Sequence, residues 1–471
     1  MDRFRHALTV VTVAIAIFMT NLDTSIVNIA LPTLARYFQA DTDEVSRVVL
    51  AYLLSMVCLV LVFGKVSDRV GHEKIFLAGY AVFTVASALC AFAPGLLLLV
   101  LSRFIQGIGS AMLLATWGAI AVKYLPAEIR GRAFGIVTVF GGVGMAIGAP
   151  VGGLLLSWLS WKWIFLINVP AGILAILLIR LLFKTGSREH RPEEKFDYAG
   201  SLLSLVAFFC LFLLLNTGQD NGWLSWRSLL LSGATLVSFT GFIIRERSFR
   251  FPILDLDLLR KRHLLFGFIT TLTVTMILMG FNFLFPFFFD LVRHLDPGRT
   301  GLLLMTFPLI SILVSPLSGY FSDKSGPRRV SLIALALLIL STCGILFFGV
   351  HTPYWFVVLA FLFFGTGLAL FFTANTSLIM SHSVPGRESM LSASIATVSY
   401  LGSAIGIVLF ENIFSFRFPA TGGREIMDTI PAGIVVSGFI HASVFGIILA
   451  LAGFLTTLLS GENRPVPSPG K

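Results

Sequence analysis

The feature that most constrains this chain is a succession of long apolar runs. A helix needs about 20 apolar residues to cross roughly 30 Å of hydrocarbon. Runs such as YAGSLLSLVAFFCLFLLLN (Tyr198–Asn216) do not alternate between polar and apolar residues, as the strands of a membrane barrel would. The sequence therefore predicts an all-α polytopic membrane protein. We count fourteen spans, near residues 7–31, 45–64, 75–93, 96–121, 133–157, 163–183, 198–216, 228–245, 264–289, 301–321, 330–350, 354–380, 390–415 and 435–460.

Composition agrees with a lipid environment. Charged residues make up 12% of the chain, against about 25% in an average soluble protein. The four cysteines all fall in apolar runs, where neither a disulfide framework nor a metal cluster is expected. The first apolar run is too long for the core of a cleavable signal peptide, so we interpret it as a retained span.

The distribution of Lys and Arg predicts the orientation. With an even number of spans, both termini lie on one side, and that side holds most of the 34 basic residues, including the linkers RLLFKTGSREHRPEEK and RERSFRFPILDLDLLRKR. Basic loops stay in the cytoplasm, so both termini are predicted to be cytoplasmic. The formal charge of +10 then reflects topology and does not indicate a nucleic-acid partner. We expect a monomer in a prokaryotic plasma (inner) membrane.

Two cytoplasmic loops resemble each other. GKVSDRVGHEK (Gly64–Lys74) follows the second span, and GYFSDKSGPRR (Gly319–Arg329) follows the tenth. Such internal repeats are typical of transporters, with the substrate site near the bilayer midplane. We therefore expect two six-helix bundles, residues 1–190 and 263–471. The seventh and eighth spans then form an inserted pair, in residues 191–262, that does not line the central cavity.

The repeated loop is a candidate cytoplasmic gate. Its glycines allow tight turns, and its Asp can accept hydrogen bonds from helix N-terminal amides or pair with Arg130 or Arg132. Such a clasp would lock one conformation and release another; the alternative is a solvated turn. The gate residues are Gly64, Asp68, Arg69, Gly71 and Asp323.

Asp23 lies inside the first span, in NLDTSIVNIALP (Asn21–Pro32), where an ionised side chain costs from a few to well over ten kcal/mol. It therefore needs a partner, water or a proton. Helix rise places Asp23 about 13 Å from the outer end of its span, Arg103 about 12 Å and Glu411 about 9 Å from theirs. We expect these three groups to share the outer half of the bundle.

This depth agreement allows two interpretations of Asp23. An acid whose surroundings change during transport can take up a proton on one side and release it on the other, and a lipophilic cation would compete for the same carboxylate. The alternative is a static pair with Arg103 or a bond to nearby backbone. Glu411 belongs either to this site or to the outer headgroup region.

Other polar and small residues in the spans are candidates too. Asn28, Gln106, Asn282 and Asn375 either form interhelical hydrogen bonds or, with Trp117, line a cavity. The fifth span is rich in glycine and holds a proline, which favour close helix approach and a kink. Its candidate gating residues, for which ordinary packing is the alternative, are Gly144, Gly148, Pro150, Gly152 and Gly153.

Four stretches together resemble the major facilitator superfamily, most closely its fourteen-span drug:proton antiporter branch. They are LDTSIVNIALP (Leu22–Pro32), GKVSDRVGHEK, LSRFIQGIGSA (Leu101–Ala111) and GGVGMAIGAPVGG (Gly141–Gly153). The resemblance implies that the acid of the first helix serves coupling or substrate recognition and that the fourth-helix arginine serves proton transfer. His72 and Glu73 stand where the family usually has basic residues in the loop. Pro150 sits one position away from the usual place of the proline before the glycine pair.

These observations predict a secondary active exporter that exchanges protons for hydrophobic, often cationic, small molecules. The proton gradient would drive it without a cofactor, since no nucleotide-binding G-x-x-x-x-G-K-[ST] loop occurs. The same fold could instead export an endogenous lipid, fatty acid or metabolite. An intramembrane enzyme or a channel is disfavoured, because neither a catalytic constellation nor a filter-like segment is evident.

Overall fold

The computed structural model describes residues 2–182, 197–222, 224–248, 262–380, 388–416, 418 and 430–460. Within them the chain is helical, and thirteen helical stretches are long and apolar enough to cross a membrane. The described part of the seventh expected span adds a shorter apolar helix, Ala199–Leu214. The all-α membrane architecture is thus confirmed, and the count of fourteen stays a prediction. Most of the two charged linkers and the C-terminal tail lie outside the described residues.

The helices divide between two compact units, which are described separately. The first comprises Met1–Ile253, Phe289–Met305 and Ala420–Ile430, and the second the remainder. The helices of the first unit are α1 (Asp2–Phe38), α2 (Thr42–Val70), α3 (His72–Ala91), α4 (Leu96–Tyr124), α5 (Ala127–Trp158), α6 (Trp163–Leu166), α7 (Asn168–Leu182), α8 (Tyr198–Asn221), α9 (Trp226–Ser248) and α12 (Pro297–Leu304). Those of the second are α11 (Arg262–Leu291, nearly all of it), α13 (Thr306–Ser325), α14 (Pro327–Ile345), α15 (Tyr354–Met380), α16 (Glu388–Ser415) and α17 (Ala432–Leu459).

Two of the expected spans are interrupted helices. A break at Ile167 separates α6 from α7, and a break at Met305 separates α12 from α13. Pro170 and Pro308 each follow three residues later. Proline lacks a backbone donor and its ring clashes with the carbonyl four residues back, so the helix is interrupted just before it.

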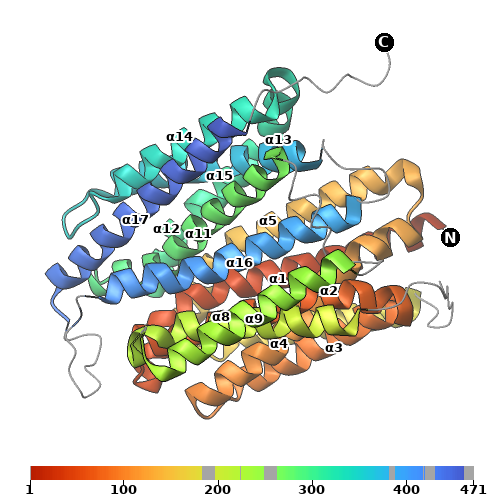
Figure 1. Cartoon of the computed structure of the whole chain (residues 1–471), viewed down its shortest axis with the longest axis horizontal. Helices are drawn as coiled ribbons and strands as arrows, with labels where there is room; N and C mark the ends of the chain where they lie inside the picture. The colour runs from red at the N-terminus through yellow and green to blue at the C-terminus, as the bar shows by residue number, and fades with distance from the viewer. Residues whose placement is uncertain are drawn as a thin grey trace. The chain divides into compact units, whose positions relative to one another are not determined.

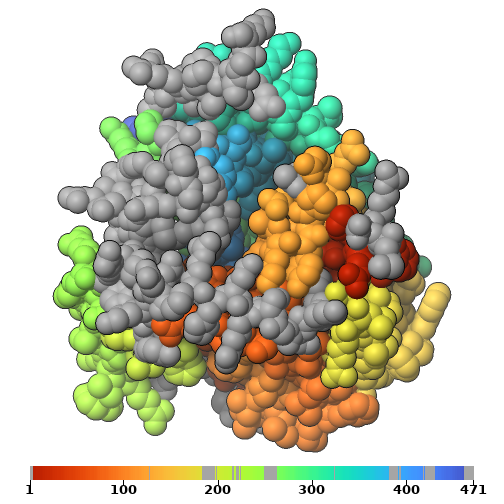
Figure 2. All heavy atoms as spheres, turned by 90° about the vertical axis from the view of Figure 1, so that its right-hand side faces the viewer, coloured from red at the N-terminus to blue at the C-terminus, as the bar shows by residue number. Residues whose placement is uncertain are grey.

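The inserted pair is part of the first unit and packs against α2. α8 and α9 lie side by side, and α8 contacts α2 (Figure 1). Asp197 caps α8 by accepting from Gly200 N at 2.9 Å, and Arg245 of α9 donates to the same carboxylate at 3.0 Å. In an end-on view the yellow-green residues of α8 and α9 lie at the left of the orange helices (Figure 2). This contact places the pair, which sequence position alone could not do.

The two units repeat the same helix contacts. In the first, Gly107 of α4 packs so tightly that an added Cβ would lie 2.5 Å from the carbonyl oxygen of Tyr52; in the second, Gly365 of α15 approaches the carbonyl oxygen of Phe307. Only glycine allows such approaches between helix backbones. The repeat predicted from the loops therefore extends into the packing of the helices.

A second pair of contacts shows which residues of α1 correspond to which residues of α11. A Cβ on Gly144 would lie 2.6 Å from the carbonyl oxygen of Phe18, and one on Gly402 would lie 2.7 Å from that of Leu272. Equating these contacts aligns the two helices residue by residue. The resulting pairs include Asp23 with Ile277, Asn28 with Asn282 and Pro32 with Pro286.

Candidate functional site

Asp23 is held at the centre of the first unit by three side chains. Its Oδ2 accepts from Nη1 of Arg103 at 2.5 Å. Its Oδ1 accepts from Nε2 of Gln106 at 2.8 Å and from Nδ2 of Asn168 at 3.1 Å. Asp23 and Arg103 are both 0% exposed. The ion pair joins the two residues that helix rise places at one depth.

Arg103 also holds its own surroundings together. Its Nε donates to the carbonyl oxygen of Val48 at 3.1 Å, and its Nη1 donates to Oε1 of Gln106 at 2.7 Å. The guanidinium lies over the Tyr52 ring, 4.3 Å from its centroid. Nη2 has no hydrogen-bond partner among the described residues. The cation is thus compensated by charge, by hydrogen bonds and by an aromatic face.

A continuous network grows from this pair across five helices. Gln106 Nε2 donates to Oγ of Ser87 at 2.8 Å, which reaches α3. Tyr52 donates its hydroxyl to Oγ of Ser110 at 2.8 Å, which links α2 to α4. We call Asp23, Arg103, Gln106, Asn168, Ser87 and Tyr52 the polar hub. A buried polar network is stable only when most of its members have hydrogen-bond partners, and most members of this one do.

Close helix packing positions the hub. Besides Gly107 on Tyr52, α4 carries Gly109, where an added Cβ would lie 2.5 Å from the backbone nitrogen of Phe83 in α3. These glycines bring α4 against α2 and α3 at the level of Arg103. The stretch RFIQGIG therefore serves two purposes: polar side chains on one face make the hub, and glycines bring the neighbouring backbones close.

The glycines predicted to gate lie against α1. An added Cβ on Gly148 would lie 2.5 Å from Cβ of Ser25, and one on Gly152 would lie 2.7 Å from Cγ1 of Ile26. Gly153 instead approaches the carbonyl of Pro297 in α12. Pro150 lies within α5, which stays helical from Ala127 to Trp158. The gating role itself stays a prediction.

The loop predicted to be the cytoplasmic gate joins α2 to α3 through Gly71, whose φ of +103° favours glycine. Nε2 of His72 lies 3.8 Å from Oδ1 of Asp68. Arg130 donates to the carbonyl oxygens of Val122 and Leu125 at the end of α4. Gly64 has open space around it and Arg69 is exposed. The side chain of Asp323, the counterpart of Asp68, lies outside the described residues.

Glu73, one of the departures from the family pattern, forms its own buried cluster. Its Oε1 lies 2.8 Å from Nζ of Lys123 and accepts from the Tyr124 hydroxyl at 2.7 Å. The acid on α3 has therefore gained a cation from α4. The negative charge of Glu73 at the start of α3 is compensated locally by Lys123 at the end of α4.

Each of the remaining candidates is packed within its own unit. Glu411 is 2% exposed, on α16 of the second unit. Asn375 donates to Oγ1 of Thr271 at 2.8 Å and to the carbonyl of Gly267 at 3.2 Å. Trp117 packs edge-on against Phe134, with centroids 5.2 Å apart. Asn282 is 6% exposed.

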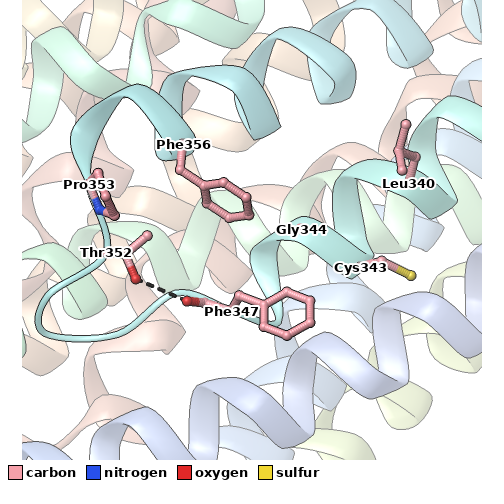
Figure 3. Close-up of a pocket in the computed structure, with 7 residues that line it drawn as sticks. All are labelled: Leu340, Cys343, Gly344, Phe347, Thr352, Pro353 and Phe356. Atoms are coloured by element: carbon pink, nitrogen blue, oxygen red, sulfur yellow. Dashed lines mark hydrogen bonds between the residues drawn. The ribbon is translucent and has the colours of Figure 1, made fainter.

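A groove of about 500 Å³ opens between the end of α14 and the start of α15 (Figure 3). Its lining is almost wholly apolar, and Thr352 closes the turn by donating to the carbonyl of Phe347 at 2.9 Å. None of the predicted site residues lines it. The seven lining residues are Leu340, Cys343, Gly344, Phe347, Thr352, Pro353 and Phe356.

Sequence reasoning missed several residues of these clusters. Asn168 completes the hydrogen bonding of Asp23, yet it stands at the start of α7, in a segment for which the sequence predicts one continuous span. The sequence signal that could have indicated the helix break at Ile167 is Pro170. Lys123 pairs with Glu73 of another helix, which no local pattern indicates. Among the described residues, no group of three or more His, Cys, Asp or Glu side chains is arranged to hold a metal ion.

Comparison with known proteins decides the family. The model of the Major Facilitator Superfamily matches residues 13–407. The chain belongs to this superfamily. It is 31% identical to the riboflavin transporter RibZ of Clostridioides difficile over 448 residues, covering 94% of this chain and 96% of that one.

A second relative and a solved structure agree with this assignment. The multidrug resistance protein Stp of Mycobacterium tuberculosis is 31% identical over 425 residues, covering 90% of this chain and 79% of Stp. A bacterial homologue of the human lysosomal transporter Spinster, in an inward-facing and unoccupied conformation, matches with a TM-score of 0.69 at 14% identity, covering 97% of each chain. The family resemblance of the motifs is confirmed, and the chain is a multi-pass membrane transporter of the superfamily.

Proposed function

We propose that the protein is a proton-coupled secondary active exporter of hydrophobic, often cationic, small molecules, working by alternating access. The observation that supports this most is the ion pair of Asp23 and Arg103, buried among helices that must move during transport. The relative named multidrug resistance protein Stp adds support. The proton gradient would be the only energy source, and no cofactor would be needed.

In this mechanism the polar hub handles the proton. With Arg103 bound, the carboxyl group of Asp23 and the guanidinium form a compensated pair. Rearrangement of α1 against α4 would separate the two charges, and the isolated carboxylate would then take up a proton because an unpaired charge in lipid is costly. Return of Arg103 to Asp23 would expel that proton on the other side.

The other predicted residues take supporting roles in this proposal. The glycines and Pro150 of α5 would let α1 slide and tilt, and the loop of Gly64, Asp68, Arg69, Gly71 and Asp323 would close the cytoplasmic side. Asn28, Gln106, Trp117, Asn282 and Asn375 would line or support the cavity, and Glu411 would be a second acid of it. The transporter would be a monomer in a prokaryotic inner membrane, with both termini in the cytoplasm and α8 and α9 outside the transport path.

The test uses proteoliposomes that contain a pH-sensitive dye. Addition of ethidium, a lipophilic cation, should change the internal pH with native protein but not with Asp23→Asn. Asp197→Asn is the matched control, because Asp197 is also a buried acid paired with an arginine but lies outside the hub. A pH change that survives Asp23→Asn and is lost with Asp197→Asn would reject the hub as the proton site.

A second candidate function is export of an endogenous metabolite. Both carboxylate oxygens of Asp23 are occupied by side chains of the protein itself, so a cationic substrate has no free acceptor there. RibZ is a riboflavin transporter and aligns along nearly its whole length. Proton movement driven by neutral compounds such as riboflavin, with silence for lipophilic cations, would favour this alternative.

A further inference from the structure

Asn28 is the buried polar group of α1 that the hub leaves unexplained. It is 1% exposed, yet neither Nδ2 nor Oδ1 has a hydrogen-bond partner among the residues that the structure describes. Gln106 and Asn375, two other buried amides, are bonded to neighbouring helices. A buried amide with both ends unbonded lowers stability, so its presence calls for a partner that arrives at another stage of the cycle.

The surroundings of α1 show which face Asn28 occupies. The glycines of α5 pack against Phe18 and Ser25, and Asp23 turns towards α4 and α7. At 100° per residue, Asn28 lies on the same side of α1 as Asn21 and Thr24, at spacings of seven and four, and away from Asp23. At the level of Asn21 this side meets α5, because a Cβ on Gly141 would lie 3.0 Å from Nδ2 of Asn21. The stretch NLDTSIVN thus separates its polar residues. Asp23 faces α4 and α7, and Asn21, Thr24 and Asn28 form a stripe on another side of α1.

Two members of this stripe are already bonded to their own helix. Asn21 donates to the carbonyl of Ile17 at 3.0 Å, and Thr24 donates to that of Thr20 at 3.0 Å. Both are partly exposed. Asn28 alone of the three keeps its full capacity, with a donor beside an acceptor.

We propose that Asn28 is the residue that hydrogen-bonds the transported molecule, and that the molecule presents a neutral cis-amide edge, as in a lactam, imide or urea. The carboxamide donates from Nδ2 to the carbonyl of such an edge and accepts its N–H at Oδ1, which makes two parallel bonds. Recognition by a neutral amide leaves Asp23 to the proton. This assignment rests on the second candidate function, export of a neutral metabolite, and names its substrate class.

The test compares two fluorescent probes with purified full-length protein in detergent. Lumiflavin has an imide edge, and 3-methyllumiflavin lacks its N–H. Native protein should bind lumiflavin about tenfold more tightly than the methylated probe, because loss of the N–H leaves a buried acceptor unbonded. Asn28→Leu should reduce this ratio to about one, and Asn28→Ala should do the same without added bulk.

Stability separates recognition from a structural role. Asn28→Leu should keep or raise the melting temperature, since it removes an unbonded amide, whereas Asn375→Leu should lower it by breaking the bonds to Thr271 and Gly267. A probe ratio that persists in both Asn28 variants overturns the proposal, as does native protein that binds neither probe or binds both equally. If the ratio of the two probe affinities depends on Asn28 but no proton movement occurs in liposomes, the coupling mechanism is rejected and the assignment of Asn28 is supported.

Discussion

The two units place very different side chains on the same helix positions. By the register of the shared glycine contacts, Arg103 and Gln106 of the first unit correspond to Phe361 and Phe364 of the second. Asp23 corresponds to Ile277. The first unit therefore has an ionic network where the second has hydrocarbon.

The apolar version is well packed. Phe307, the counterpart of Tyr52, lies 6.0 Å from Phe361 and 5.6 Å from Phe364 between ring centroids, in edge-on geometry that aromatic pairs prefer. Phe281 joins them at 6.1 Å from Phe364. Phe281, Phe361 and Phe364 are 0% exposed, and Phe307 is 3% exposed.

The difference teaches what the charges are for. Buried ion pairs seldom stabilise a protein more than well-packed apolar residues do. The second unit shows that this helix arrangement accepts phenylalanine at those positions. Packing therefore does not require Asp23 and Arg103, and we infer that the first unit keeps them for transport.

The largest effect on stability is expected when one member of the pair is removed. Arg103→Leu leaves Asp23 without its cation and should destabilise the first unit by roughly 3–5 kcal/mol, as for other broken buried pairs. Phe361→Leu makes a similar cut at the corresponding position and should cost less, because it removes no charge partner. Unfolding in mixed micelles measures both. Equal losses of unfolding free energy in the two variants would mean that the ion pair is no more important for stability than the packed rings.

A smaller effect is expected at the shared glycines. Gly107→Ala would place a methyl group 2.5 Å from the Tyr52 carbonyl and should destabilise by about 1–3 kcal/mol through overpacking. Gly365→Ala should behave alike. Gly118→Ala on α4 has open space and is the control. Melting temperatures that fall with Gly118→Ala and not with the other two would contradict the repeated packing.

The smallest effect is expected at the end of α1. Arg36 forms a bidentate pair with Asp290, at 3.2 and 2.6 Å, but its side chain is 38% exposed. Arg36→Ala should change the unfolding free energy by about 0–1 kcal/mol, since water screens exposed pairs. Salt titration provides a check, because the difference from native protein should shrink as ionic strength rises. A loss as large as that of Arg103→Leu would show that exposure does not distinguish the two pairs.

Much of this comparison was accessible from the sequence, and its limits are physical. Span counting and helix rise placed Asp23 and Arg103 at one depth, because depth depends only on rise per residue. The repeated loops indicated two related halves. The apolar counterpart of the hub could not be identified from the sequence. The correspondence between residues of α1 and residues of α11 becomes visible only in the backbone contacts at glycines.

Other parts of the site depend on tertiary contacts that no local pattern encodes. Asn168 reaches Asp23 because the chain breaks before Pro170 and starts α7 beside the hub. Glu73 looked like a defect in the loop, yet it pairs with Lys123 from another helix. For Asn28 the sequence left two interpretations open, an interhelical bond or a cavity position, and neither amide atom has a hydrogen-bond partner among the described residues.

The most direct test is to build the second unit's apolar arrangement into the first. Asp23→Ile, Arg103→Phe and Gln106→Phe are combined in one variant, and its stability and its substrate-driven proton movement are measured together in detergent and in liposomes. We predict an unfolding free energy closer to native than that of Arg103→Leu, with complete loss of proton movement. A variant that is less stable than Arg103→Leu would make the hub a structural requirement. One that is stable and still moves protons would contradict the claim that these charges serve transport.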